Sequence, residues 1–161
     1  MKPALYTASV PVFRHYLGRV QAIVETVGAE DLHARVSDAF PAGQQFSTAA
    51  EIALRTVCAL AGREVPGLPR ALAPRLAVVR ATLGAMRPEE FVGAQARRIS
   101  HVAGTAELEQ SGEEFLLLFG LPNFFFHVTM GYAALRGAGV PLGKADFDGQ
   151  HLYPDGFSFE P

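Results

Sequence analysis

Hydrophobic residues near the start of the chain recur at alternating steps of three and four positions. This spacing places them on one side of an α-helix of about five turns. The members of this pattern are Val10, Phe13, Leu17, Val20, Val24 and Val27. Ser9 is expected to cap the helix, unless Tyr6 and Ala8 extend it backwards, and Gly28 is expected to end it.

Two further segments, residues 41–61 and 72–86, show the same helical spacing. Pro41 suits the first turn of the second helix, and Gly62 is expected to stop it. The third helix is expected to end before Pro88, and the Pro/Gly-rich residues 63–69 separate it from the second. The buried side of the second helix is predicted to consist of Phe46, Ala49, Ala50, Ala53, Val57 and Leu60.

A fourth segment, residues 115–135, contains no Asp, Glu, Lys or Arg. A helix that is apolar all round is buried on every side or lies in a membrane. Asn123 and His127 argue against a membrane, because unpaired polar groups are unfavourable in hydrocarbon. We therefore expect the central helix of a soluble protein, or a helix half buried in a homodimer interface. Ser111 and Glu114 have the spacing of a capping box at its start, and Pro122 is expected to kink or split it.

The remaining segments are less regular. Residues 96–102 alternate roughly between polar and apolar side chains, which is typical of a short strand or hairpin, and His101 is expected to be an exposed loop residue. Residues 140–161 are rich in Gly, Pro and aromatic residues and are expected to pack on the bundle or on a second subunit. Lys144 and Asp146 are expected to anchor this tail through an ion pair, the alternative being that they form the rim of a pocket. The aromatic residues of the tail are Phe147, Tyr153, Phe157 and Phe159.

The chain has 161 residues, which predicts a single domain over residues 1–161. Its net charge is −2 and it has no basic stripe, so no nucleic-acid partner is expected. The single cysteine, Cys58, has apolar neighbours and is expected to be a core residue. We recognise no signal peptide, which predicts a cytoplasmic location, and we expect no membrane partner.

Candidate chemistry is concentrated on one face of the fourth helix, which carries Gly120, Asn123, His127, Gly131 and Ala134. Asn123 and His127 are four residues apart, so they can bond to each other or to a common group. They are either a satisfied polar pair that fixes helix packing or a ligand contact. On the second helix, Gln44, Thr48, Glu51 and Arg55 form a polar line. This line is a solvated face, or else Gln44, Gln45 or Glu51 lines the same pocket.

The sequence contains no phosphate loop, dinucleotide fingerprint, HExxH, CxxC or GxSxG motif. None of the five histidines lies four residues from another, so no single helix offers two histidine ligands. No metal site is therefore expected. A zinc site would need ligands from separate segments, such as His127, Glu51 and a third group.

Residues 122–149, which read PNFFFHVTMGYAALRGAGVPLGKADFDG, resemble the C-terminal signature of an uncharacterised domain-of-unknown-function family. That family belongs to the DinB-like four-helix-bundle superfamily. Residues 6 and 9–13 resemble the start of the family. Residues 38–41, Gln45, Ala49, Glu51 and residues 60–62 resemble its middle, although the family often has Asp in place of Glu51.

The resemblance implies an all-α, DinB-like four-helix bundle with a long crossover between helices two and three, a short hairpin before the last helix, and a homodimer. Some DinB-like relatives are metal-dependent enzymes that transfer or hydrolyse thiol-linked substrates, using three histidines of which two lie four apart on the last helix. Here Asn123 precedes His127 by four residues and Gly131 follows it by four. No histidine lies between His33 and His101.

Two functions are therefore open. The first is a dimeric bundle without a cofactor that binds a small ligand near Asn123, His127, Gln45 and Glu51. The alternative is an enzyme that uses a divalent metal such as zinc or nickel, with His127 as a ligand. The sequence does not decide whether the protein is an enzyme.

Overall fold

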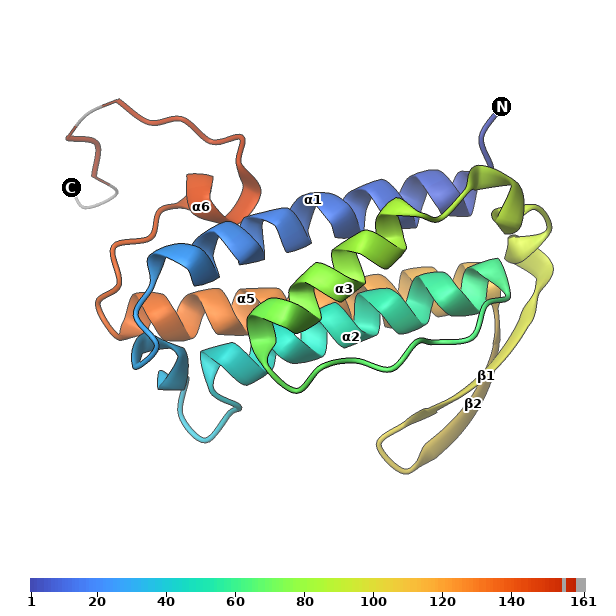
Figure 1. The fold of residues 1–161 in the computed structure, drawn as a ribbon, viewed down its shortest axis with the longest axis horizontal. Coiled ribbons are helices and arrows are strands. Elements are labelled where there is room, and N and C mark those ends of the chain that lie inside the picture. The colour runs from blue at the N-terminus through green and yellow to red at the C-terminus, as the bar shows by residue number, and fades with distance from the viewer. Residues whose placement is uncertain (155, 159–161) are drawn as a thin grey trace.

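The computed structural model spans the chain and describes residues 1–154 and 156–158. The protein is mostly helical, with one two-stranded sheet (Figure 1). The longer helices are α1 (Ala4–Thr26), α2 (Ala42–Ala61), α3 (Leu72–Gly84) and α5 (Leu121–Gly137). The strands are β1 (Arg98–Ala103) and β2 (Ala106–Ser111). The short helical segments are η1 (Asp31–His33), η2 (Pro88–Phe91), η3 (Ala94–Ala96), α4 (Gly112–Glu114), η4 (Phe115–Gly120) and α6 (Lys144–Asp148).

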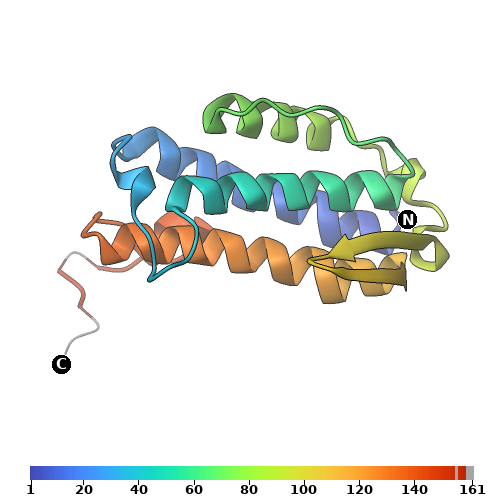
Figure 2. The ribbon, with the colours of Figure 1, turned by 90° about the horizontal axis from the view of Figure 1, so that it is seen from below.

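The four longer helices pack side by side around one core. Helices α1 and α5 run in one direction and α2 and α3 in the other, because residues 62–71 return along the length of the molecule before α3 begins (Figure 1). This is the long crossover expected from the sequence. In Figure 2, α3 lies on one side of the α1–α2 pair and α5 on the opposite side. The largest fully buried side chains include Phe13, Leu17, Phe46, Leu54, Leu76, Leu83, Phe124 and Leu135.

The first helix confirms the predicted spacing but begins earlier than a Ser9 cap would allow. It starts at Ala4, so Ser9 lies inside the helix, fully buried, and its hydroxyl donates to the Leu5 carbonyl oxygen at 2.5 Å. The Ser9 cap is wrong, and the alternative, a helix extended backwards through Tyr6 and Ala8, is confirmed, because the apolar pattern continues to Leu5. Pro11 also lies within α1.

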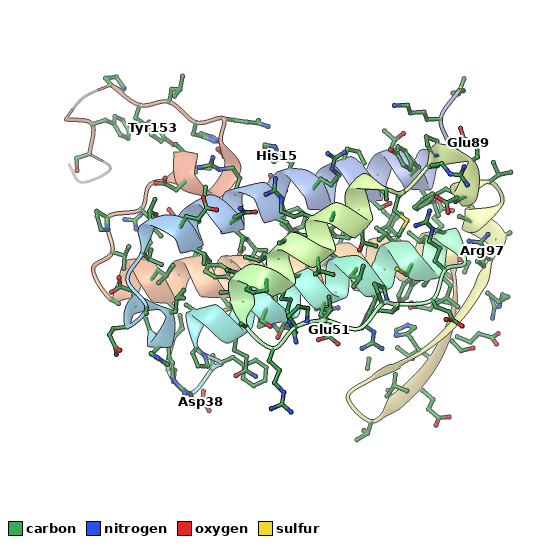
Figure 3. All side chains as sticks on the ribbon, in the orientation of Figure 1. His15, Asp38, Glu51, Glu89, Arg97 and Tyr153 are labelled. Atoms are coloured by element: carbon green, nitrogen blue, oxygen red, sulfur yellow. The ribbon has the colours of Figure 1, made fainter. Side chains whose placement is uncertain are left out.

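The second helix ends as the sequence predicts. Gly62 follows Ala61 with φ of 68°, a left-handed conformation that glycine adopts without a steric penalty. The Arg97 side chain donates to the Leu60 carbonyl oxygen, so a long-range contact also satisfies this helix end (Figure 3). Cys58 is fully buried, as expected of a core residue.

The predicted hairpin is present, slightly later in the chain than residues 96–102. Strands β1 and β2 are antiparallel, and His101 lies opposite Leu108. The expectation for His101 is wrong, because this residue is on β1 and only partly exposed. Its ring packs against Phe115 and Phe119, with centroid distances of 4.8 and 4.4 Å. The hairpin folds back onto the start of the last helix, a long-range contact that local sequence does not indicate.

The last helical segment is continuous from Gly112 to Gly137 but changes its hydrogen-bonding pattern. The capping box is confirmed: the Glu114 N–H donates to the Ser111 hydroxyl at 3.3 Å, and the Ser111 N–H donates to the Glu114 carboxylate at 2.9 Å. Segment η4 is a π-helix whose last bond runs from the Leu121 N–H to the Leu116 carbonyl oxygen. Pro122, which has no N–H, then occupies the first turn of α5. The proline therefore follows a π-helical segment, and the helix does not split.

The uncharged helix is not buried on every side. Its inner face packs on α2 and, through Phe124 and Phe125, on rings of α1, but Leu117, Leu118 and Phe126 are 47, 68 and 56% exposed. By length and composition, Gly112–Gly137 could cross a membrane, although apolar core helices of soluble proteins pass the same test. Only 33% of its most apolar 18-residue window is buried. Within the chain the helix is therefore partly buried, and the expectation that it is buried on every side is wrong.

The first part of the tail packs on the bundle as expected. The Phe147 ring lies 5.6 Å from the Tyr16 ring and 5.5 Å from the Tyr132 ring. The Arg19 side chain donates to the Asp146 carbonyl oxygen at 3.0 Å. The expected ion pair is wrong within the described part of the chain, because the Asp146 carboxylate instead accepts the Gly143 N–H. Phe159 lies outside the described residues, and Tyr153 and Phe157 are partly exposed and stack on each other.

Candidate functional site

The structure brings Gln45 of α2 against His127 of α5, with 2.6 Å between Gln45 Oε1 and His127 Nδ1. The two helices approach closely because α5 presents small residues at this interface. A Cβ atom on Gly131 would lie 2.5 Å from Cε1 of the fully buried Phe46. A Cβ atom on Gly120 would lie 2.7 Å from Cγ2 of Thr56. The face of small residues predicted from the sequence therefore sets the distance at which the glutamine and the histidine meet.

Gln45 is the buried partner of this pair, with only 2% of its surface exposed. Its Nε2 atom donates to the Phe40 carbonyl oxygen at 3.4 Å, while Oε1 accepts from His127. One amide group thus links the loop before α2 to α5 and fixes the orientation of the imidazole. Buried amides are usually satisfied in this manner, so the pair also has a structural role.

The contact determines which nitrogen of His127 carries the proton. An amide oxygen can only accept, so Nδ1 is the donor and Nε2 keeps a lone pair. No described residue bonds to Nε2. Burial lowers the pKa of His127 from its ordinary value of 6.5, so the ring is neutral at pH 7. A neutral imidazole with a free nitrogen can accept a hydrogen bond, take up a proton or bind a metal ion.

A cleft of about 240 Å³ lies beside this imidazole. The Phe126 ring meets the His127 ring edge-on at 5.2 Å, and Phe126 and Phe40 are 56 and 49% exposed. The cleft is therefore a largely apolar, open depression with a neutral histidine and a buried amide in its wall. Its lining residues are Asp38, Ala39, Phe40, Gln45, Phe126 and His127.

Residues 5–148 match the model of a family described as "Domain of unknown function (DUF1993)". The chain belongs to this DUF1993 family. Its structure is similar to a crystal structure of a DinB family member protein from Shewanella denitrificans, with a TM-score of 0.79 and 28% sequence identity. That similarity covers 93% of this chain and 94% of the other. The family therefore lies within the DinB-like superfamily, as the sequence resemblance indicates. No curated protein matches the chain.

In this DUF1993 protein, Asn123 does not share a partner with His127. Its Nδ2 atom donates to the Phe119 carbonyl oxygen at 2.8 Å, one turn earlier in the same helical segment. Asn123 is also absent from the lining of the cleft. The expectation that the two residues bond to each other or to a common group is wrong, because each finds a separate partner.

Glu51 is also directed away from His127. Its carboxylate lies 3.4 Å from Arg75 Nη1 of α3 and 3.8 Å from Arg55 Nη1 of α2. Figure 3 shows Asp38 ahead of the start of α2 and Glu51 farther along that helix. Glu51 therefore links α2 to α3 from a partly solvated side of α2, whereas Gln45 faces α5. Of the acidic residues, Asp38 is the one that lines the cleft.

The residues around His127 do not fit the three-histidine metal site of DinB-like enzymes. Among the described residues, no group of three or more His, Cys, Asp or Glu side chains is placed to hold a metal ion. Nδ1 of His127 faces an amide oxygen, and the position four residues before it holds Asn123, which is bonded to its own helix. Glu51, the carboxylate considered from the sequence, is paired with arginines.

Sequence reasoning identified Gln45 and His127 but missed three residues of the cleft: Asp38, Phe40 and Phe126. Asp38 and Phe40 lie in the segment 38–41, which carries part of the family resemblance. That resemblance was the signal in the sequence that could have identified them. Phe126 is adjacent to His127, but its exposure on an uncharged helix has no signature in the sequence.

Proposed function

We propose that this DUF1993 protein is a water-soluble, homodimeric DinB-type four-helix bundle that binds a small molecule in the cleft beside His127. The observation that carries this proposal is the 2.6 Å contact between His127 and the buried Gln45, which leaves Nε2 of a neutral imidazole without a partner among the described residues, next to an open cleft. The contact fixes the ring in advance, so binding need not order it.

The lining of the cleft favours one class of ligand. Aromatic walls from Phe40 and Phe126 suit a flat or aliphatic body. The free Nε2 atom accepts, so the ligand would present an N–H or O–H group to it. The Asp38 carboxylate at the edge favours a neutral or cationic ligand over an anion. These features point to a small, mainly apolar molecule with one hydrogen-bond donor, such as an amine, an alcohol or an azole.

We propose that a second copy of the chain packs on the outer face of the last helix. This face comprises Leu117, Leu118, Pro122 and Phe126, all exposed, and it lies in a stretch without charge from residue 115 to 135. A stable dimer buries about 800 Å² per partner, less than a tenth of the 9130 Å² surface of this protomer. Because Phe126 belongs to both the face and the cleft, dimerisation would also narrow the mouth of the cleft.

The ligand proposal is tested with a fragment library screened by ligand-observed NMR. Compounds that bind the native protein are retested on His127→Gln and Phe40→Ala, with His33→Gln as a control in an exposed histidine outside the cleft. We expect donor-bearing compounds to lose about tenfold or more in affinity on the two cleft variants and to bind the control normally. Equal binding to all variants that keep their melting temperature would contradict the proposal.

The dimer proposal is tested separately by light scattering after size exclusion. We expect a mass of twice 17.3 kDa for the native chain and a monomer for Leu118→Glu, because a charge at an apolar interface is not compensated. Val92→Glu is the matched control, since Val92 is 69% exposed against 68% for Leu118 but lies after η2. A native monomer at about 100 μM, well above the Kd of a stable dimer, would refute this part without affecting the cleft.

A further inference from the structure

The loop before α2 gives the cleft beside His127 a negative charge. Asp38 lies in this loop, at the opposite end of α2 from the hairpin, and lines the cleft (Figure 3). Within the described part of the chain, its carboxylate takes part in no ion pair and in no hydrogen bond. None of the described lysines and arginines lines the cleft. A ligand that enters the cleft therefore meets one carboxylate that no neighbouring cation neutralises.

The conformation of this loop is fixed by its own backbone. The Ala42 N–H donates to the Ala34 carbonyl oxygen at 2.9 Å and closes the loop. Ser37 has φ of 51°, a left-handed value that residues other than glycine seldom adopt, and the Ala39 N–H donates to the Val36 carbonyl oxygen at 3.0 Å across it. Such a conformation persists only where its surroundings hold it. The loop therefore needs no ordering when a ligand binds, which lowers the cost of binding.

The polar side-chain groups that the cleft leaves for a ligand are hydrogen-bond acceptors. Both ends of the Gln45 amide are bonded within the protein. His127 presents the lone pair of Nε2, and Asp38 presents its carboxylate oxygens. The neutral His127 ring does not repel a cation, because burial lowers its pKa. An ammonium group carries three donors and no acceptor, so it matches these groups better than an alcohol, which also brings lone pairs.

The two aromatic residues of the cleft suit the same class of ligand. Phe40 and Phe126 are 49 and 56% exposed, so part of each side chain remains available for contact. Aromatic side chains accept apolar groups, and the negative face of the ring also attracts a nearby ammonium ion. A cation on an apolar body can therefore gain from both the aromatic side chains and the carboxylate.

The size of the cleft limits the ligand and also determines how far the charge of Asp38 acts. A cavity of about 150 Å³ holds a benzene ring, so about 240 Å³ holds one ring with a short side arm. A compact space of this volume is about 8 Å across, no more than the Debye length at physiological ionic strength. The carboxylate therefore acts on a charged group anywhere in the cleft, including one that it does not contact directly.

We propose that the ligand of this cleft is a primary ammonium ion carried on an apolar body about the size of one ring. This inference rests on the proposed binding function and narrows its ligand class from neutral or cationic molecules to cations. Benzylamine, which is protonated at pH 7, is the simplest probe of this class. Benzyl alcohol has nearly the same shape without the charge, and benzoate carries the opposite charge, so the three compounds separate shape from charge.

The test is a titration of the full-length protein with each compound, followed by two-dimensional NMR of backbone amides. We expect benzylamine to bind with a Kd of about 1 mM, a reasonable value for so small a molecule, and to shift the signals of Asp38, Phe40 and His127. Benzyl alcohol should bind about three- to fivefold more weakly, and benzoate at least about tenfold more weakly. Raising the NaCl concentration from about 50 to about 500 mM should reduce the difference between amine and alcohol to less than about twofold.

A pair of variants assigns the preference to one carboxylate. Asp38→Asn keeps the size of the side chain but removes its charge, so the affinity for benzylamine should fall to that for benzyl alcohol, which should itself stay unchanged. Glu107→Gln is the matched control, because it removes one negative charge from an exposed residue of β2 outside the cleft. This control should leave both Kd values as in the native protein.

The outcomes separate this inference from the function on which it rests. The inference is overturned if benzyl alcohol binds the native protein as tightly as benzylamine, if Asp38→Asn retains the preference for the amine, or if benzylamine fails to bind while other fragments do. In each case the cleft remains a binding site, provided that the compounds that bind lose affinity on His127→Gln. If no compound of this series or of the fragment library shifts the cleft signals up to about 20 mM, the proposed binding function itself fails, and the inference fails with it.

Discussion

The two ends of the interface between α2 and the last helix each hold a histidine bonded to a glutamine, but the two sites differ in which ring nitrogen remains. His127 uses Nδ1 for Gln45 at 2.6 Å and leaves Nε2 beside an open cleft. His101 uses Nε2 for Gln110 at 2.8 Å and leaves Nδ1 buried, without a hydrogen-bond partner among the described residues. At the open site, around His127, water can satisfy the free nitrogen. At the closed site, around His101, the free nitrogen is out of reach of water.

Glycines set the helix spacing at both ends, but against different neighbours. Gly131 faces the buried ring of Phe46, and Gly120 faces the short side chain of Thr56. The Phe46 ring can be replaced by a smaller apolar side chain. At Thr56 a smaller side chain would still crowd the new atom, because the Thr56 Cβ atom itself lies 3.3 Å from the position of a Cβ added to Gly120. The comparison predicts that overpacking at Gly131 can be relieved by a second substitution in Phe46.

The largest expected effect follows from Gly131→Ala. The new methyl group would lie 2.5 Å from the Phe46 ring, so we expect the free energy of unfolding to fall by about 1–3 kcal/mol. Urea denaturation measures this change. Adding Phe46→Leu should recover part of the loss, because the smaller side chain vacates the overlap. Gly137→Ala, with no atom within 4 Å of the added Cβ, serves as the control and should not destabilise.

The next largest effect concerns the glutamine of the open site. Gln45→Met keeps the length of the side chain but removes the acceptor of His127 Nδ1 and the donor to the Phe40 carbonyl oxygen. We expect the unfolding free energy to fall by about 1–2 kcal/mol, because two partly buried groups lose their partners. The NMR signal of the His127 Nδ1 proton should disappear in this variant. An unchanged unfolding free energy would mean that water makes both hydrogen bonds that the Gln45 amide makes in the native protein.

A substitution beside the closed site should not lower the free energy of unfolding, in contrast to Gln45→Met at the open site. Thr56→Val removes a buried hydroxyl that has no partner in the described part of the chain, so the unfolding free energy should stay unchanged or rise by up to about 1 kcal/mol. Urea denaturation measures this change in the unfolding free energy. A loss comparable to that of Gln45→Met would show that the hydroxyl is bonded in solution in a way that the described contacts do not include.

The helices, and the candidacy of Gln45 and His127 for one site, could be predicted from the sequence because both depend on helical periodicity, but the bond between these two side chains could not, because the sequence favoured Asn123 as the partner of His127. The spacing of Val10, Phe13 and Leu17 identifies the buried side of α1, and the small residues of the last helix identify the face that meets α2. The direction of Glu51 could not be predicted, because a polar line on a helix does not state whether it meets Arg75 or solvent.

The features missed by the sequence depend on contacts between distant segments. His101 looks like a loop residue until the hairpin folds onto Phe115 and Phe119. Pro122 indicates a disturbance of the helix but not the π-helical hydrogen bonds that accommodate it. The absence of charge over residues 115–135 predicts burial, yet Leu118 is 68% exposed within the protomer. Which side of an uncharged helix is left exposed depends on how the other helices pack on it, which no pattern within the helix specifies.

The smallest expected effect is a pH dependence that belongs to the open site. Burial lowers the pKa of His127 in the folded protein, while the unfolded chain keeps the ordinary value of 6.5. Between these two pKa values the unfolded state binds more protons, so the contribution of His127 to stability is complete above pH 6.5 and declines as the pH falls through the window. Denaturation midpoints above and below pH 6.5 measure the decline.

His127→Gln should show a shallower decline than the native protein, whereas His33→Gln, in which an exposed histidine is replaced, should retain the native slope. Equal slopes in all three proteins would show that the half-buried ring accepts a proton as readily as a solvated one, and the cleft would then bind its ligand through a charged histidine.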